Sequence, residues 1–168
     1  MPRFQPEAIL GALNRHGVRY VLIGGLAATL HGSTIRTGDA DICPARDADD
    51  LERLAAALGD LQPRLRAADT PEGVRFPCDA VFFSRVDVCN LTTTYGDLDI
   101  SFTPSGTRGF DDLTRHVVIY DLDGLTVPVA SLDDVIRSKR AANRAKDRAA
   151  LPELEALRDE IRRRVRGK

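Results

Sequence analysis

Residues 21–43 have the sequence VLIGGLAATLHGSTIRTGDADIC, and the fold is decided in this stretch. The apolar run over residues 19–23 predicts a short buried strand, and residues 26–30 predict a helix that opens directly after Gly24 and Gly25. Glycine lets the backbone approach a ligand closely, and the N–H groups at a helix N-terminus attract phosphate. The stretch therefore predicts a phosphate-binding turn between a strand and a helix.

Two acidic residues follow the predicted turn. Residues 39–43 predict a second strand, which Pro44 ends. Residues two apart in a strand project to the same face, so the carboxylates of Asp39 and Asp41 point the same way. Neighbouring carboxylates repel each other unless a cation lies between them, and hard oxygen ligands suit Mg²⁺ or Mn²⁺. A calcium-binding loop is excluded because Cys43 and Pro44 occupy the positions that need an oxygen ligand and a glycine. A glycine turn with a metal-binding carboxylate pair is what nucleotidyl transfer requires.

A third strand carries a further candidate ligand. Alternation over residues 98–102 points the apolar side chains to the core and leaves Asp97, Asp99 and Ser101 on the other face. If this strand lies beside residues 39–43, Asp99 reaches the same site, where it binds a second metal ion or accepts a proton from the attacking hydroxyl. Asp97 competes with Asp99 for this place and has the alternative role of capping the preceding turn.

The remaining patterns predict helices packed on a small mixed α/β sheet. Helices are expected over residues 5–16 and 47–59, from Ser131, and finally from a start or kink at Pro152. Further strands are expected over residues 86–91, 117–120 and 125–129. Loops are expected over residues 60–79 and 103–115, and the second loop should contain one helical turn. We expect a single domain, with a core over residues 1–130 and a basic C-terminal helical segment over residues 131–168 packed on it.

Composition and charge narrow the class of protein. The chain has 168 residues, is 43% hydrophobic and lacks a run of about 20 apolar residues, which predicts a globular protein without a membrane partner. The N-terminus is too polar for a secretory signal, and three cysteines without a CxxC pair indicate a reducing cytoplasm. Residues 1–136 carry 12 basic and 20 acidic side chains, whereas residues 137–168 carry 12 basic and 5 acidic ones. This basic tail either contacts phosphates or forms a solvated helix surface.

The pattern of strand, glycine pair, Asp-x-Asp and a later apolar-Asp-apolar strand resembles the polymerase-beta-type nucleotidyltransferase superfamily. The matching residues are Gly24, Gly25, Asp39, Asp41 and Asp99, the last flanked by Leu98 and Ile100. Residues 131–157, SLDDVIRSKRAANRAKDRAALPELEAL, also resemble the end of small prokaryotic nucleotidyltransferases of the abortive-infection toxin kind, which carry a Lys and then an Arg/Lys-Asp pair. Together the matches cover most of residues 18–160.

The resemblance implies a small nucleotidyltransferase-type mixed sheet with flanking helices and a C-terminal helical pair. It also implies Mg²⁺- or Mn²⁺-dependent transfer of a nucleoside monophosphate from an NTP to a hydroxyl. In the toxin-like members the acceptor is the 3′ end of tRNA, and a cognate antitoxin protein is the implied partner. Carried over by position, the three aspartates hold the metals and catalyse, the glycines cradle the triphosphate, and Lys139 or Lys146 neutralises it, with Asp147 in a supporting place.

Alternatives remain open for these residues and for the acceptor. Arg36 either contacts phosphate or balances the carboxylates, the two lysines are otherwise plain surface lysines, and Asp147 is otherwise a helix-surface carboxylate paired with an arginine. A protein hydroxyl or a small molecule such as an aminoglycoside would serve as acceptor in place of RNA. Many relatives have Ser where this chain has Gly25, which supports the further alternative of a catalytically inactive RNA- or protein-binding module. No residue distinguishes ATP from CTP, GTP or UTP.

Overall fold

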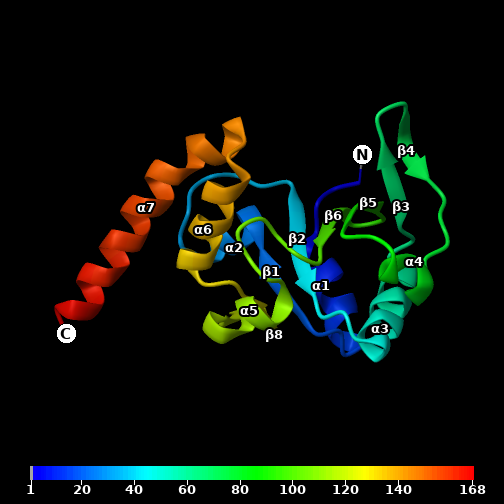
Figure 1. The fold of residues 1–168 in the computed structure, drawn as a ribbon, viewed down its shortest axis with the longest axis horizontal. Helices are drawn as coiled ribbons and strands as arrows, with labels where there is room; N and C mark the ends of the chain where they lie inside the picture. Colours follow the sequence, from blue (N-terminus) through cyan, green and yellow to red (C-terminus); the bar gives the residue numbers. More distant parts are fainter. Residues whose placement is uncertain (1) are drawn as a thin grey trace.

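A mixed eight-stranded sheet forms the centre of the computed structural model, which describes residues 2–168 (Figure 1). The strands are β1 (Tyr20–Ile23), β2 (Asp39–Pro44), β3 (Arg64–Ala67), β4 (Thr70–Val74), β5 (Val88–Thr93), β6 (Gly96–Ser101), β7 (Val118–Leu122) and β8 (Leu125–Val129). Their order is β4-β3-β5-β6-β2-β1-β8-β7. Strand β2 runs antiparallel to β1 and parallel to β6. The predicted class, a mixed α/β sheet with flanking helices, is confirmed.

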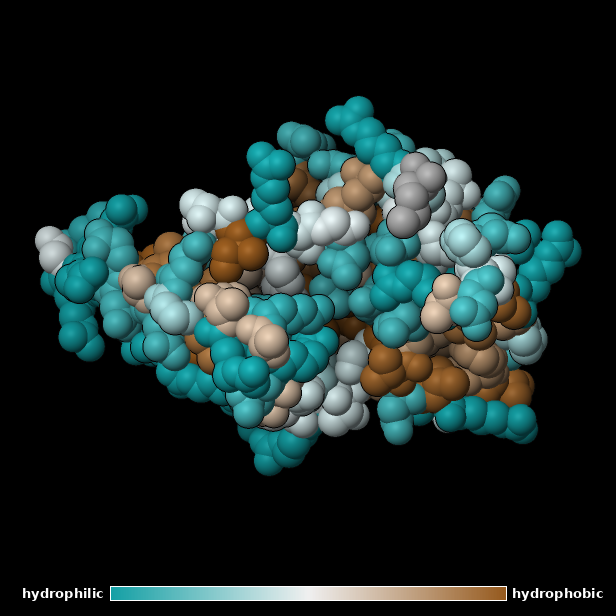
Figure 2. Space-filling view, turned by 90° about the horizontal axis from the view of Figure 1, so that it is seen from above, coloured by the Kyte–Doolittle hydropathy of each residue, from teal (hydrophilic) through white to brown (hydrophobic). Residues whose placement is uncertain are grey.

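Helices cover the sheet and extend beyond it. They are α1 (Pro6–Arg15), α2 (Gly24–His31), α3 (Ala48–Gly59), α4 (Ala80–Ser84), α5 (Phe110–Leu113), a 3₁₀ turn (Thr114–His116), α6 (Leu132–Ala142) and α7 (Ala145–Arg166). Helices α6 and α7 pack against each other as the predicted C-terminal pair, and the far end of α7 projects from the body (Figure 1). Side chains on this projecting end are mostly hydrophilic (Figure 2). Within residues 2–168, no helix has both the length and the apolar character needed to cross a membrane.

One hydrophobic core joins the sheet to both ends of the chain. Leu22 and Ile42 from the middle strands, Ile9 from α1, and Ile136 and Leu154 from the C-terminal pair all belong to the same buried cluster. The C-terminal helices are therefore held on the sheet by buried apolar surface, which is the main favourable term in folding. The division at residues 130 and 131 stays a prediction, and the first residue of the predicted core, Met1, lies outside the described residues.

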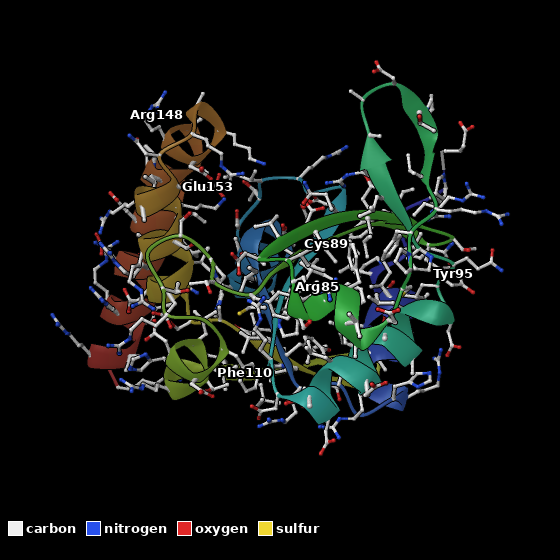
Figure 3. The ribbon with its side chains drawn as sticks, turned by 45° about the vertical axis from the view of Figure 1, so that its right-hand side comes forward. Arg85, Cys89, Tyr95, Phe110, Arg148 and Glu153 are labelled. Atoms are coloured by element: carbon white, nitrogen blue, oxygen red, sulfur yellow. The ribbon has the colours of Figure 1, made fainter. Side chains whose placement is uncertain are left out.

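The expected loop over residues 60–79 was wrong, because β3 and β4 form a hairpin there that pairs with β5. The hairpin lies at the edge of the sheet and is largely exposed, so the sequence lacks the alternation that marks a half-buried strand. Pro71 and Gly73 lie within β4, and an edge strand tolerates a residue without an N–H donor. The hairpin and the α6–α7 pair stand on opposite sides of the middle strands (Figure 3).

Other boundaries differ from the prediction by a few residues. Helix α2 opens at Gly24 itself, and β2 includes Pro44 as its last residue. Helix α7 begins at Ala145, so Pro152 lies inside it and does not start it. The expected start of α6 is confirmed, since Ser131 Oγ accepts a hydrogen bond from the N–H of Asp134 at 3.1 Å.

Candidate active site

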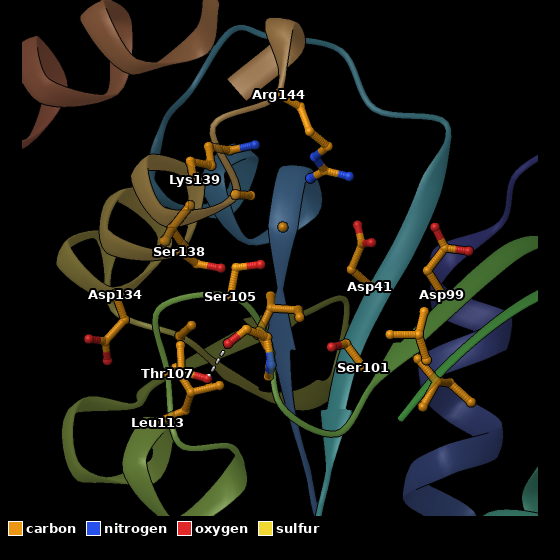
Figure 4. A pocket seen from close by; sticks show the side chains of 18 of the residues that line it. Asp41, Asp99, Ser101, Ser105, Thr107, Leu113, Asp134, Ser138, Lys139 and Arg144 are labelled. Atoms are coloured by element: carbon orange, nitrogen blue, oxygen red, sulfur yellow. Dashed lines mark hydrogen bonds between the residues drawn. The ribbon is translucent and has the colours of Figure 1, made fainter. Parts of the chain in front are cut away.

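The register of the middle strands brings three carboxylates together. Asp41 lies opposite Ile23 at the end of β1 and opposite Asp99 on β6. Asp39 precedes Asp41 by two residues and shares its face. One carboxylate oxygen from each of the three aspartates lies within 4.8 Å of the others. Figure 4 shows Asp41 and Asp99 side by side at one wall of a pocket.

The electrostatics of this cluster fit a divalent cation. Burial, and then the charges of Asp39 and Asp99, raise the pKa of Asp41 to about 7. Burial also raises the pKa of Asp99, against the opposing charge of Arg66. Three half-buried carboxylates this close are unfavourable in their ionised form unless a cation neutralises them. Their hard oxygen donors suit Mg²⁺ or Mn²⁺, so the residues fit the predicted metal.

The carboxylate of Asp97 pairs with an arginine and does not belong to the cluster of three aspartates. Although Asp97 lies opposite Asp39 in the sheet, its carboxylate contacts Arg66 Nη1 at 2.9 Å. The second terminal nitrogen of Arg66 contacts Asp99 at 2.5 Å. Arg66 therefore joins the two aspartates, and Asp99 is the one that shares the cluster with Asp39 and Asp41. Sequence reasoning missed Arg66 because it lies on the unpredicted hairpin.

The two glycines lie directly against the acidic strand. Gly24 has a positive φ of 69°, and a Cβ atom there would lie 2.8 Å from Cγ of Asp41. A Cβ on Gly25 would lie 3.0 Å from both Cβ and Oγ1 of Thr37. Helix α2 has no side-chain cap at its N-terminus, which leaves its first N–H groups for a ligand. The glycine pair thus allows close approach of both the acidic strand and a phosphate.

Basic side chains face the acidic cluster from the C-terminal helices. Lys139 on α6 and Arg144, which precedes α7, line the pocket opposite Asp41 (Figure 4). Lys146 is exposed. Burial and the neighbouring carboxylates raise the pKa of Asp41 and of Asp99, and the positive charge of Lys146 offsets part of this rise. Carboxylates thus line one wall of this pocket and basic groups line the opposite wall. Such a pocket is suited to bind a polyanion together with a divalent cation.

A buried carboxylate holds two of these cations. Asp147 is 0% exposed, contrary to the alternative of a helix-surface residue, but it is paired with an arginine as that alternative expected. Its carboxylate lies 2.7 Å from Nε of Arg144 and 3.5 Å from Nζ of Lys139, and the hydrogen bonds from Arg144 lower its pKa against the opposing effect of burial. The sequence did not single out Arg144, because it looks like the other arginines of the C-terminal segment. Only its contact with Asp147 distinguishes it from them.

The structure does not bring Arg36 to the pocket. Its side chain is exposed and, among residues 2–168, has no hydrogen-bond or ion-pair partner. The segment before β2 is anchored elsewhere, since Glu153 on α7 accepts hydrogen bonds from Ser33 Oγ at 2.9 Å and from the N–H of Thr34 at 2.8 Å. Both interpretations of Arg36 therefore remain without a contact that supports them.

The pocket beside the aspartates has a volume of about 330 Å³. It lies between the sheet, the segment after β6 and helix α6. Hydroxyl groups and apolar side chains share its wall, among them Ser101, Ser105, Ser138, Leu113 and Val135. None of these was named as a candidate site residue, although Ser101 was expected on the same strand face as Asp99. A pocket of this size and mixed polarity is suited to a small organic molecule or to part of a nucleotide.

Comparison with known proteins identifies the fold. The sequence matches no protein-family model and no protein of curated function. The lincosamide antibiotic adenylyltransferase LnuA, solved with lincomycin bound, is similar in structure with a TM-score of 0.60 and 18% identity over 92% of this chain and 99% of that one. The antibiotic-resistance factor ANT(2'')-Ia is similar with a TM-score of 0.50 and 15% identity over 96% and 91%. The chain therefore has a nucleotidyltransferase-type α/β fold.

Proposed function

We propose that this protein is a metal-dependent nucleotidyltransferase, which moves a nucleoside monophosphate from an NTP to an acceptor hydroxyl. The observation that carries the proposal is the arrangement of Asp39, Asp41 and Asp99 on two adjacent strands, facing the glycine start of α2 and a set of basic side chains. Metal carboxylates, a phosphate-binding helix start and cations in one pocket are the parts that phosphoryl and nucleotidyl transfer require.

The proposed roles follow from the position of each group. The aspartates would hold one or two Mg²⁺ ions, which supply charge neutralisation and orientation at the α-phosphate. The N–H groups after Gly24 and the cations Lys139 and Arg144 bind the triphosphate. The acceptor oxygen forms a bond to the α-phosphorus, the bond from that phosphorus to the bridging oxygen of the β-phosphate breaks, and pyrophosphate leaves. In this scheme Asp99 accepts the proton of the acceptor hydroxyl.

A small hydroxyl-bearing molecule is the acceptor that we favour. The pocket volume of about 330 Å³ and its mixed apolar and hydroxyl lining suit such a molecule. The names of both similar structures refer to antibiotics, and one of them is an adenylyltransferase. An acceptor of that kind, with ATP as one of four NTPs to test, fits the pocket between the sheet, the segment after β6 and helix α6.

The basic tail gives only weak support to the tRNA acceptor that the toxin resemblance implies, because several of its arginines are paired with acidic side chains. Arg162 is paired with Asp133 at 2.9 Å, while Arg163 and Arg164 both contact Glu160. Paired guanidinium groups have less charge to offer an RNA phosphate backbone. We keep tRNA, and with it a toxin role, as the second candidate, because Lys146 and the end of α7 remain exposed.

One experiment tests the transferase and separates its acceptors. Purified protein with Mg²⁺ is incubated with each α-³²P-labelled NTP and with a panel of aminoglycosides and lincosamides, total cellular RNA, or cellular protein. The Asp39→Ala/Asp41→Ala variant is the inactive control, and Glu52→Gln on the exposed face of α3 is the matched acidic control. Label in a small molecule that is lost only in the aspartate variant supports the favoured proposal.

The other outcomes point elsewhere. Label in a tRNA-sized band moves the acceptor to tRNA, and label in a protein indicates an antitoxin-like modifier. No transfer to any acceptor, with wild-type protein that is not stabilised by Mg²⁺ or Mn²⁺, would contradict the enzyme and favour the inactive binding module.

A further inference from the structure

The position of Thr37 explains why residue 25 is a glycine. Thr37 lies in the segment before β2, and its Oγ1 and Cβ atoms border the space that a side chain on Gly25 would enter, each 3.0 Å from where a Cβ atom on residue 25 would lie. A contact of 3.0 Å between such atoms is tighter than ordinary van der Waals packing, so one of the two residues would have to move. A serine at residue 25 therefore competes with Thr37 for the same space.

The Thr37 hydroxyl is also bonded to the acidic cluster. Oγ1 donates to Oδ1 of Asp39 at 2.9 Å and lies 3.2 Å from the backbone oxygen of Asp39. A donor on one carboxylate oxygen fixes the side-chain torsion and leaves the second oxygen free for a cation. Asp39 accepts no other side-chain hydrogen bond among residues 2–168, so the orientation of its carboxylate depends on this contact.

The segment that carries Thr37 is anchored at both ends. At its start, Glu153 accepts hydrogen bonds from Ser33 and Thr34, the latter through both N–H at 2.8 Å and Oγ1 at 3.2 Å. At its end, Asp39 enters the ladder with β6. Because both ends of this short segment are fixed, Thr37 is held against Gly25, and a displacement of Thr37 is transmitted to Asp39.

We infer that Thr37 is a positioning residue for the metal ligand Asp39, and that Gly25 is required because its missing side chain makes room for Thr37. The inference rests on the proposed function, since it concerns the same cation site. It changes the interpretation of Gly25: the glycine is a condition of a well-oriented metal ligand and not a lost phosphate contact. Residues 25 and 37 are accordingly coupled in metal binding, although neither binds the metal.

Mn²⁺ affinity without nucleotide, measured by titration calorimetry and by the electron paramagnetic resonance of free Mn²⁺, tests this inference. Thr37→Val keeps the shape and removes the donor, and we expect it to weaken Mn²⁺ binding about tenfold, the size of effect seen for groups that orient metal ligands. Thr37→Ser keeps the donor and should bind within about threefold of wild type, because the same hydrogen bond to Asp39 can form. Near-ultraviolet circular dichroism confirms that each variant is folded.

A double-mutant cycle tests the role of Gly25. Gly25→Ala should weaken Mn²⁺ binding about tenfold in the wild type but by less than about threefold in the Thr37→Val background, because the hydroxyl contact that it disturbs is already absent. Equal losses in both backgrounds, or wild-type affinity in Thr37→Val, would overturn the inference while leaving the proposed function intact. If the wild type binds no Mn²⁺ and neither does Asp41→Asn, the proposed function and the inference both fail.

Discussion

The burial of Asp41 beside two other carboxylates has a measurable cost to the stability of the metal-free protein. The pKa of Asp41 rises from 3.8 to about 7 in the folded state, mainly through burial and then through Asp39 and Asp99. Between these two pH values the folded chain keeps a proton that the unfolded chain has lost, so the free energy of unfolding falls as the pH rises from about 4 to about 7. At about 1.36 kcal/mol for each pH unit, the loss is up to about 4 kcal/mol and is complete above about pH 7.

Replacing Asp41 by Asn removes this titration, so we expect Asp41→Asn to be more stable than wild type at about pH 8 in EDTA, by up to about 4 kcal/mol. At about pH 4 the two proteins should be close, because Asp41 is protonated in the folded wild type. Urea unfolding from about pH 4 to about pH 8.5 measures the difference, and comparison with wild type cancels the carboxylates whose pKa is lowered, such as Asp147. Glu52→Gln, on the exposed face of α3, is the control for the loss of an acidic side chain.

Metal provides the second half of this test. Millimolar Mn²⁺ should stabilise the wild type at about pH 8 and leave Asp41→Asn almost unchanged, because a ligand that binds only the folded state raises its stability. The reasoning is refuted if the stability difference between the two proteins is independent of pH, or if Asp41→Asn is the less stable protein in alkaline buffer without metal.

Three further predictions concern groups around the cluster. Asp147→Asn should destabilise the protein by about 3 kcal/mol, because it leaves Lys139 and Arg144 without their buried partner, and it should also raise the KM for NTP. Asp159→Asn on the same helix is the control, and it should change neither the unfolding free energy nor the KM. Arg66→Ala should strengthen Mn²⁺ binding, because it removes a positive charge that pairs with Asp99, whereas Asp97→Asn should weaken it, because it removes a negative charge beside the site; weaker binding in Arg66→Ala would instead show that Arg66 mainly orients Asp99. Reversing Arg162 to Glu should leave transfer to a small acceptor unchanged but reduce transfer to tRNA, and the salt dependence of the rate separates the two cases.

The parts of the site that the sequence predicted depend on local periodicity. The same-face placement of Asp39 and Asp41 follows from the two-residue repeat of a strand, and the glycine pair before a helix is a contiguous motif. The fold class follows from the order of apolar runs and turns. Asp99 required one further assumption, that β6 lies beside β2, and the ladder from Asp39 to Ile42 confirms this neighbourhood.

The parts that the sequence did not predict are contacts between distant segments. Arg66 reaches Asp99 from 33 residues away, through a hairpin whose exposed strands carry no clear alternation. Arg144 differs from the other tail arginines because Asp147 and the turn between α6 and α7 orient it. The pairing of Thr37 with Gly25 is likewise invisible in the sequence, since it depends on how a loop returns over the start of α2.

The strand register decides which aspartates can work together, and this gives the site its physical logic. With Asp41 opposite Asp99, a shift of β6 by one residue would place Leu98 or Ile100 opposite Asp41 and turn the acidic face toward the core. Leu98 and Ile100 are both fully buried, so the hydrophobic core enforces the register that brings the carboxylates together. The repulsion among those carboxylates is thus imposed by apolar packing elsewhere in the sheet, and a bound divalent cation would relieve it.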